Sequence, residues 1–190
     1  MWASVAGLDS ESYGKYFQWW NNFWFRYRDE NGVNLPITTS TSKVDTTWYW
    51  PWNYYNSSTF ITWLASFSNW SDPENNNLWW GITNTKAARQ WPCESWYHIP
   101  SKNEWKEVII NGWWWSSWND MSDVLKLPMA GFLTNNLSLT NGGSNGYYRT
   151  SDYVWRVWLA YSLQFYSDGA EGDYSSSWSR DALFIRCFKN

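Results

Sequence analysis

The sequence predicts an α+β domain, because one helix with clear end signals is followed by several strand-like runs and the loops between them are long and polar. The helix lies near the middle of the 190-residue chain. A chain of this length holds one domain with a proper core and is short for two. We therefore expect a single domain over residues 1–190.

The first half of the chain gives few signals of regular structure. Residues 13–28 mix aromatic and polar side chains without a clean period, and residues 29–58 consist mainly of loop formers. The run SSTFITWLASF at 57–67 fits either a short strand or a helix, and turn chemistry returns at 69–80. This half is expected to be mostly loop.

The predicted helix lies within residues 98–112, HIPSKNEWKEVIING. Ser101 is a candidate N-cap, and Glu104, three residues later, completes a capping box. Trp105, Val108 and Ile109 are spaced i, i+3, i+4 and make one apolar face, and an Asn-Gly pair ends the helix.

Strand patterns dominate after the helix, first at 124–134 and then beyond a glycine-rich turn at 140–146. The three further runs cover 146–153, 157–165 and 181–190. The last run alternates as a strand does, with Leu183, Ile185 and Cys187 on one side and Phe184, Arg186 and Phe188 on the other.

Charge and hydropathy exclude several classes of protein. The net charge of −3 argues against nucleic acid as a partner, because phosphate binding needs a basic surface. No apolar run approaches the ~18 residues of a membrane-spanning helix. The N-terminal stretch lacks the basic and apolar regions of a signal peptide, and an upstream signal would be lost if the chain is a fragment.

The residues that could carry catalysis are sparse. His98 is the one histidine, and beside a proline and a helix cap a hydrogen-bonded structural role is favoured over catalysis. No phosphate-binding glycine motif occurs, and no pair of carboxylates stands out as a glycosidase site. Cys93 and Cys187 fit neither a zinc site nor a redox CxxC. We expect no metal, no cofactor and no enzymatic activity.

The two cysteines leave two alternatives open. They either form one long-range disulfide or remain as two buried thiols. The loop-entropy model gives such a disulfide roughly 4–5 kcal/mol, and the bond would persist only in an oxidising compartment.

Residues 147–178 have the composition of a recognition surface. Tyrosine and serine dominate this segment, with Trp, Arg, Asp and Glu between them. Tyrosine and tryptophan give a large contact area at low entropic cost, and serine gives adaptable hydrogen bonds. The alternative is that such residues simply suit exposed strands and their loops.

Five blocks of the sequence resemble a known family. PCESWYHIPSKNEW (92–105) resembles the pattern C-P-x-G-[WY]-H-[IV]-P-[ST]-x-x-E-W, and SRDALFIRCFKN (179–190) resembles G-[FY]-S-V-R-C-V-[KR]-[DN]. YGKYFQWWNN (13–22), LKLPMAGF (125–132) and GSNGYYRTSD (143–152) resemble three further blocks in the same order. Together they resemble the Fibrobacter succinogenes major paralogous domain. The resemblance implies a C-type lectin-like fold, with short twisted antiparallel strands, one or two helices and long loops.

The resemblance also implies a function. Some members of this superfamily are variable proteins of diversity-generating retroelements, which display a hypervariable ligand-binding region on a fixed scaffold. The segment 147–178 falls where that region would lie, so we expect a protein or glycan ligand on another cell or phage surface, and an extracellular or cell-surface location. The predicted ligand contacts are Arg149, Asp152, Tyr153, Trp155, Arg156, Trp158, Tyr161, Gln164, Tyr166, Asp168, Glu171, Asp173 and Tyr174. The predicted scaffold residues are Trp105, Ile109, Leu127, Leu163, Phe165, Ile185 and Cys187.

Two alternatives accompany this hypothesis. Formylglycine-generating enzymes, which share the fold superfamily of the resembled family, are the enzymatic alternative. Their active site uses a cysteine pair, but Cys93 and Cys187 both match scaffold motifs here. A structural surface or adhesin module is the second alternative. Classical calcium lectins are a further comparison, since the letters WND at 118–120 match one of their ligand motifs. We interpret this match as coincidence, because the stretch precedes the last strands by too much chain and no EPN or QPD precedes it.

The 21 tryptophans, against 11 glycines, are far outside ordinary usage. Where the family pattern has glycine, this chain often has tryptophan. We hypothesise that a UGA codon, decoded as glycine in the source organism, is written here as tryptophan. The suspected positions are Trp20, Trp24, Trp48, Trp50, Trp52, Trp63, Trp80, Trp91, Trp96, Trp113, Trp114, Trp115, Trp118 and Trp178. Trp2, Trp19, Trp70, Trp79, Trp105, Trp155 and Trp158 fit as true tryptophans.

Overall fold

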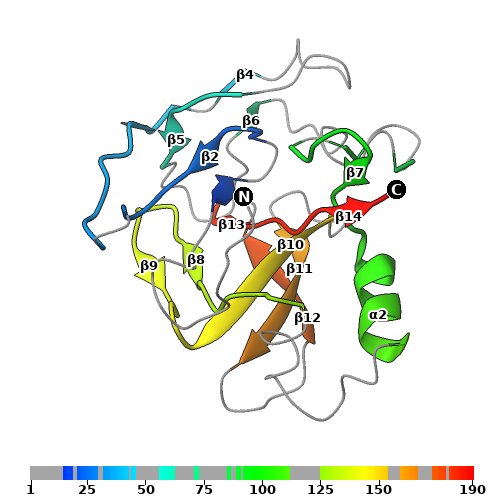
Figure 1. The fold of residues 1–190 in the computed structure, drawn as a ribbon. Helices are drawn as coiled ribbons and strands as arrows, with labels where there is room; N and C mark the ends of the chain where they lie inside the picture. The colour runs from blue at the N-terminus through cyan, green and yellow to red at the C-terminus, as the bar shows by residue number, and fades with distance from the viewer. Residues whose placement is uncertain are drawn as a thin grey trace.

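A computed structural model of the chain shows a mixed α+β arrangement, mostly of short strands, with one short helix among the described residues (Figure 1). The described residues are 15–18, 21–29, 32–42, 44–45, 56–62, 71–72, 85–86, 89–90, 92–111, 125–153, 159–166, 173–178 and 180–190. At 44–45, 71–72, 110–111, 153 and 173–178 the backbone alone is described.

The main sheet has eight strands, and its principal order is β12-β11-β10-β13-β1-β2. Neighbouring strands run antiparallel, except that β10 and β13 are parallel. Strands β8 and β9 extend the sheet from β13. The strands are β1 (Tyr16–Gln18), β2 (Trp24–Phe25), β8 (Phe132–Leu133), β9 (Leu139–Thr140), β10 (Asn145–Tyr153), β11 (Leu159–Tyr166), β12 (Asp173–Trp178) and β13 (Ala182–Phe184).

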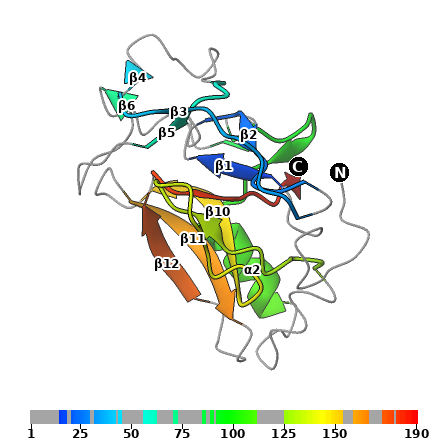
Figure 2. The same ribbon diagram turned by 90° about the vertical axis from the view of Figure 1, so that its left-hand side faces the viewer.

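Three small two-stranded sheets accompany the main sheet. Two of them are parallel and lie beside β1 and β2, away from β12 (Figure 2). The third is antiparallel and joins the segment before the helix to the C-terminal end of the chain. The pairs are β3 (Thr39–Ser40) with β5 (Phe60–Ile61), β4 (Val44–Asp45) with β6 (Ser71–Asp72), and β7 (Tyr97–His98) with β14 (Phe188–Lys189).

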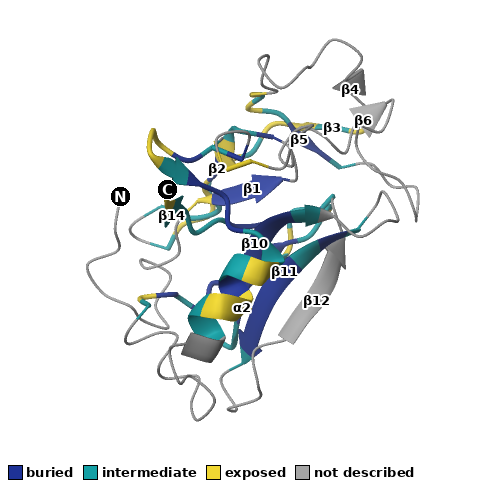
Figure 3. Cartoon of the chain, turned by 90° about the vertical axis from the view of Figure 1, so that its right-hand side faces the viewer, coloured by how far each residue is buried: buried dark blue, intermediate teal, exposed yellow. Residues whose placement is uncertain are grey.

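The helix α2 (Lys102–Asn111) begins and ends where its sequence signals predict. The Glu104 amide donates to Ser101 Oγ at 3.2 Å, and the Ser101 amide donates to Glu104 Oε2 at 2.8 Å. These two bonds satisfy amide groups that the first turn of a helix leaves without a partner, so the capping box is confirmed. Figure 3 shows the helix against one face of β10 and β11, and residues of α2 contact both of these strands.

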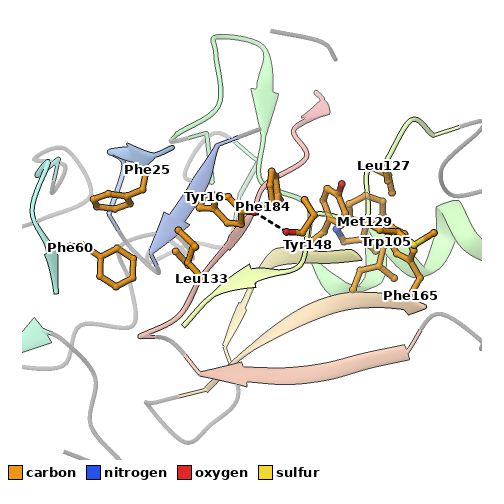
Figure 4. Packing of buried hydrophobic residues seen from close by; sticks show 13 residues of the cluster. Tyr16, Phe25, Phe60, Trp105, Leu127, Met129, Leu133, Tyr148, Phe165 and Phe184 are labelled. Carbon is orange, nitrogen blue, oxygen red and sulfur yellow. Dashed lines mark hydrogen bonds between the residues drawn. The ribbon is translucent and has the colours of Figure 1, made fainter. Parts of the chain in front are cut away.

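The main core fills the space between α2 and the sheet and continues across β13 and β1 (Figure 4). Trp105 is 1% exposed, and its ring contacts Tyr148 and Phe188 edge to face. Leu163 and Phe165 of β11 belong to the same core cluster and are buried. A Cβ at Gly146 would lie 2.1 Å from the Phe165 ring, so this position of β10 requires glycine. The predicted scaffold roles of Trp105, Leu163 and Phe165 fit this packing.

The predicted β-structure at 124–134 is mostly wrong, because the regular strand there is the two-residue β8. Residues 127–131 are nevertheless largely buried, with Leu127 1% exposed. Two tyrosine hydroxyls hold this irregular segment against the sheet. Tyr16 donates to the Ala130 carbonyl at 2.8 Å, and Tyr148 donates to the Pro128 carbonyl at 2.9 Å. These side-chain donors and the Gly143 amide, which donates to the Met129 carbonyl at 2.7 Å, take the place of the regular strand hydrogen bonds that the sequence pattern predicts.

The predicted single strand at 181–190 is also wrong, because the chain forms β13, leaves the sheet, and then forms β14. Strands β10 and β1 pair with the two edges of β13, and the consecutive residues Ala182, Leu183 and Phe184 are all buried, so both faces of β13 are covered as well. A strand buried on both faces need not alternate between apolar and polar residues. The sequence assigns Ile185 and Cys187 to the same strand. In the structure both are half-buried and lie in the connection from β13 to β14, Ile185 directly after β13 and Cys187 directly before β14.

Cys93 and Cys187 form a disulfide, which resolves the alternative left open by the sequence. The bond spans 94 residues and fastens the segment before α2 to the C-terminal end of the chain. Cys93 is 3% exposed. The pairing of β7 with β14 lies beside it, so covalent and hydrogen bonds hold the same two segments together.

The family-like block at 13–22, which contains β1, connects the segment around residues 57–61 to the main sheet. Gln18 is fully buried, and its amide donates to the carbonyls of Ile61 and Arg180 at 2.8 and 2.9 Å. Asn21 donates to the Ser57 carbonyl at 2.9 Å and accepts from the Ser57 amide at 3.1 Å. These bonds hold residues 57–61, and the described part of the run at 57–67, which ends at residue 62, contains the short strand β5 rather than a helix.

No helix among the described residues is long and apolar enough to cross a membrane.

Candidate ligand-binding surface

The segment predicted to bind ligand, 147–178, builds one end of the main sheet. Strands β10, β11 and β12 follow one another as antiparallel neighbours (Figure 2). The register places Tyr161 opposite Ser176 and Gln164 opposite Asp173. The sequence did not predict β12 as a strand, because its Ser-rich stretch has no alternation of apolar residues.

The beginning of the predicted surface is buried, which corrects the boundary drawn from composition. Residues 147–151 are each at most 8% exposed. They belong to β10, which lies between β11 and β13. An interior strand that is covered on both faces contributes to the core rather than to a surface. Within the described part of the segment, exposure returns at Asp152, which is half-buried.

Arg149 is a predicted ligand contact that the structure places inside the protein. Its side chain is 0% exposed, and one guanidinium nitrogen donates to the Asp181 backbone carbonyl at 2.9 Å. Burial lowers the pKa of Arg149 to about 9, and the nearby Asp181 carboxylate opposes this shift. A guanidinium in this position cannot touch a ligand, so Arg149 is a scaffold residue.

Asp181 completes this buried pair of charges. Burial raises the pKa of its carboxyl to about 6, against the opposing charges of Arg149 and Arg180. The carboxylate also accepts the amide hydrogen of Asn135 at 3.0 Å. Asp181 therefore joins the start of β13 to the turn after β8.

Gln164 is a second predicted contact that the structure corrects. It is 8% exposed and donates to Ser162 Oγ at 3.3 Å, and its amide oxygen accepts from the Tyr166 hydroxyl at 3.1 Å. These residues are two apart along β11, so they share one face of the strand. Gln164 thus positions Tyr166, which is half-buried and keeps part of its surface in solvent.

Asp152 and Tyr161 are brought together by a residue that the sequence did not single out, Lys102. The Lys102 ammonium lies 4.2 Å from the centre of the Tyr161 ring, as in a cation–π interaction. The backbone amide of Lys102 donates to the Asp152 carboxylate. All three residues are half-buried. We call Asp152, Lys102 and Tyr161 the helix-end cluster.

Local backbone structure explains how the helix-end cluster forms. Lys102 is the first residue of α2, where amide groups lack a partner inside the helix, and the Asp152 carboxylate accepts one of them. Thr150 turns β10 at this point, since its hydroxyl donates to the Tyr161 carbonyl at 3.0 Å and accepts from the Asp152 amide at 3.2 Å. The capping box marks Lys102 as the first helical residue, so its position could have been found in the sequence.

The electrostatic environment of Asp152 is mixed. Burial raises the pKa of its carboxyl, and the charge of Glu104 acts in the same direction. The Lys102 amide and the charges of Arg89 and Lys102 oppose this shift. The cluster therefore presents a cation, a carboxylate and an aromatic ring together, which suits polar ligands with an apolar face.

Several predicted contacts lie outside what the structure describes. Trp155, Arg156, Trp158, Asp168 and Glu171 are outside the described residues. For Tyr153, Asp173 and Tyr174 the backbone alone is described, in β10 and β12. Their roles stay predictions.

A polar network beside the helix-end cluster explains His98. The histidine is 1% exposed, with Nδ1 2.7 Å from Asn190 Oδ1 and Nε2 2.9 Å from Glu104 Oε1. Glu104 Oε2 also accepts from Arg89 at 2.6 Å. Both ring nitrogens of His98 are engaged, which fits the structural role favoured by the sequence. The partnerships with Arg89 and Asn190 have no sequence signal, because both residues are remote in the chain.

Glu104 is the centre of this network. Burial alone would raise the pKa of its carboxyl, but the hydrogen bond and charge of Arg89 outweigh this effect. The Ser101 amide and His98 add to the lowering, and the pKa falls to about 2. Glu104 therefore stays ionised at every ordinary pH.

Within the described ranges, no group of three or more His, Cys, Asp or Glu side chains is placed to hold a metal ion. Comparison of the chain with known proteins gives no matching family model, no matching curated protein and no matching solved structure.

Proposed function

We propose that the chain is a C-type lectin-like recognition domain of the Fibrobacter succinogenes major paralogous type, and that it binds a protein or glycan ligand without catalysis. The observation that carries this proposal is the helix-end cluster, where Asp152, Lys102 and Tyr161 from two strands and a helix keep part of their surface exposed. Aromatic, cationic and acidic groups held on rigid elements are typical of binding hot spots.

The roles of the family-like blocks support the fold part of the proposal. Their polar residues make contacts between segments that are far apart in the chain. Gln18 holds Ile61, and Glu104 holds Arg89. Cys93 bonds Cys187. Family members that share one scaffold need such contacts between distant segments, and here residues of the family-like blocks make them.

Burial within 147–178 supports a division between scaffold and variable positions. Arg149, Leu163 and Phe165 are buried and hold the sheet, whereas Asp152, Tyr161 and Tyr166 retain exposed surface. A retroelement-diversified protein would need such a division, since variation at buried positions would destabilise the fold. The exposed positions are where we place the hypervariable contacts.

The disulfide also bears on the alternatives. Both cysteines of the chain bond to each other, so neither thiol is free for the formylglycine-generating alternative. A disulfide is usual in extracellular proteins, and this supports a location outside the cell or on its surface. Within the part of the chain that the structure describes, no contact particularly favours the structural or adhesin alternative.

A ligand screen tests the proposal. The purified chain would be applied to glycan and protein arrays beside Tyr161→Ala and Lys106→Ala variants. Lys106 lies on the exposed side of the same helix and is the matched control. We expect a ligand that binds the parent and the Lys106 variant and loses at least tenfold in affinity with Tyr161→Ala, which is about 1.4 kcal/mol or more. Equal binding by all three proteins would place the contact elsewhere.

A further inference from the structure

The turn at residues 94–97 has a backbone conformation that favours glycine at its third position. The Tyr97 amide donates to the Glu94 carbonyl at 3.0 Å, which closes a β-turn. Within this turn Trp96 has a φ of 70°, and Ser95 is not among the residues with positive φ. This is the pattern of a type II turn, whose third residue is usually glycine or asparagine because a Cβ clashes there.

Burial of the Trp96 side chain gives little stabilisation to offset this backbone strain. Its indole is 77% exposed, the highest value among the described large apolar residues that are exposed. Trp105 shows the contrast, since it is 1% exposed and packs against two aromatic rings. Leu137 also has a positive φ, of 60°, but its side chain packs against the core. Burial can offset strain at Leu137, whereas at Trp96 this compensation is small.

The surrounding structure holds Trp96 in this conformation. Its carbonyl accepts the Asn190 amide at 2.9 Å, and the next residue begins β7, which pairs with β14. Cys93, just before the turn, is fixed by the disulfide to Cys187. The backbone at position 96 cannot leave the left-handed region without breaking these connections, so the turn itself needs a residue that tolerates positive φ.

We propose that residue 96 of the natural protein is glycine, and that its codon is a UGA that the source organism decodes as glycine. The turn geometry supplies the reason for glycine, and the excess of 21 tryptophans over 11 glycines supplies the reason for a systematic decoding difference. The exposed indole is then no ligand anchor, although its exposure alone would suggest one.

The proposal is confined to position 96 because, among the suspected tryptophans that the structure describes, Trp96 alone has a positive φ. Trp24 is 40% exposed, stacks on Phe23 and lies under the Lys15 ammonium at 4.3 Å. It is not among the residues with positive φ. For Trp178 the backbone alone is described, and the remaining suspected tryptophans lie outside the described residues.

Two measurements on the natural source identify residue 96. The codon is determined from the gene, and the peptide that contains position 96 is weighed by mass spectrometry in protein from the source organism. We expect a TGA codon and a peptide mass that corresponds to glycine. A TGG codon or a tryptophan mass would overturn the proposal.

A variant series tests the structural reason independently. Trp96→Gly, Trp96→Asn and Trp96→Ala would be compared with the chain as written by urea unfolding. Alanine removes the indole but keeps the Cβ in the left-handed region, so it separates backbone strain from exposure. We expect stability to fall in the order Gly, Asn, Ala, with the folding equilibrium constant of Trp96→Gly roughly 5- to 30-fold above that of Trp96→Ala. A Gly variant no more stable than the Ala variant would remove the geometric basis of the proposal.

Discussion

The carboxylate of Glu104 lies 2.6 Å from the guanidinium of Arg89, and this ion pair joins the first turn of α2 to the segment that precedes the disulfide. The Arg89 side chain is 6% exposed and that of Glu104 20%. The same carboxylate accepts from Ser101 and contacts His98, so one side chain serves as helix cap, ion-pair partner and hydrogen-bond acceptor.

Replacing Glu104 with glutamine should destabilise the fold markedly. Glutamine keeps the size but removes the charge, which leaves the buried Arg89 guanidinium without its counter-ion. Losses of 3–5 kcal/mol are usual for one partner of a fully buried pair, and the partial exposure of Glu104 reduces the expected loss to about 2–4 kcal/mol. Urea unfolding measures it, with Glu107→Gln on the exposed part of the same helix as the control. Similar stability of the two variants would contradict the role given to Glu104.

The acid sensitivity of the fold should also depend on Glu104. Its pKa of about 2 in the folded protein lies below the ordinary value of 4.5. The stabilisation is therefore complete above about pH 4.5 and is lost as the pH falls through about 2. The free energy of unfolding of the parent should approach that of Glu104→Gln over this window. A difference between the two proteins that stays constant from pH 7 to pH 2 would show that the ionisation of Glu104 is not the cause.

Reduction of the Cys93–Cys187 disulfide should weaken the fold strongly. The bond closes a loop of 94 residues, for which the loop-entropy model gives about 4–5 kcal/mol. The double variant Cys93→Ser/Cys187→Ser should lose a similar amount, and reductant should have no further effect on it. Unfolding in urea with and without reductant measures both. A parent protein whose two thiols can be alkylated before reduction would contradict the disulfide.

Much of the structural framework follows from local sequence signals, and much of the ligand surface does not. The ends of α2 and the strands β10 and β11 were predicted because capping and alternation are local properties. The burial of Arg149 could not be predicted, because it depends on β13, more than thirty residues away, lying beside β10.

The short strands near the N-terminus and the helix-end cluster show the same limit. Strand β5 has two residues and is ordered by Gln18 from β1, so its own sequence carries little information. Lys102 meets Tyr161 because α2 packs across β11, and this contact again depends on tertiary structure.

Natural near-copies of the gene should differ in a defined pattern if the segment 147–178 is diversified. We expect changes at adenine positions in the codons of Asp152, Tyr161 and Tyr166, since these residues retain exposed surface. Arg149 and Gln164 should stay constant, because both are buried and hydrogen-bonded. Sequencing of the locus would also reveal a reverse transcriptase gene. A locus with neither a reverse transcriptase nor a near-copy would contradict the retroelement hypothesis.

The most direct test of the account is the ligand affinity of variants in the helix-end cluster. Dissociation constants would be measured for the parent, Lys102→Ala, Tyr161→Ala and the double variant, against a ligand from the array screen. Because the Lys102 ammonium lies 4.2 Å from the Tyr161 ring, we expect both single variants to bind at least tenfold more weakly and their effects to be non-additive by about 0.5–2 kcal/mol. Folded variants that bind as tightly as the parent would contradict the claim that this cluster recognises ligand.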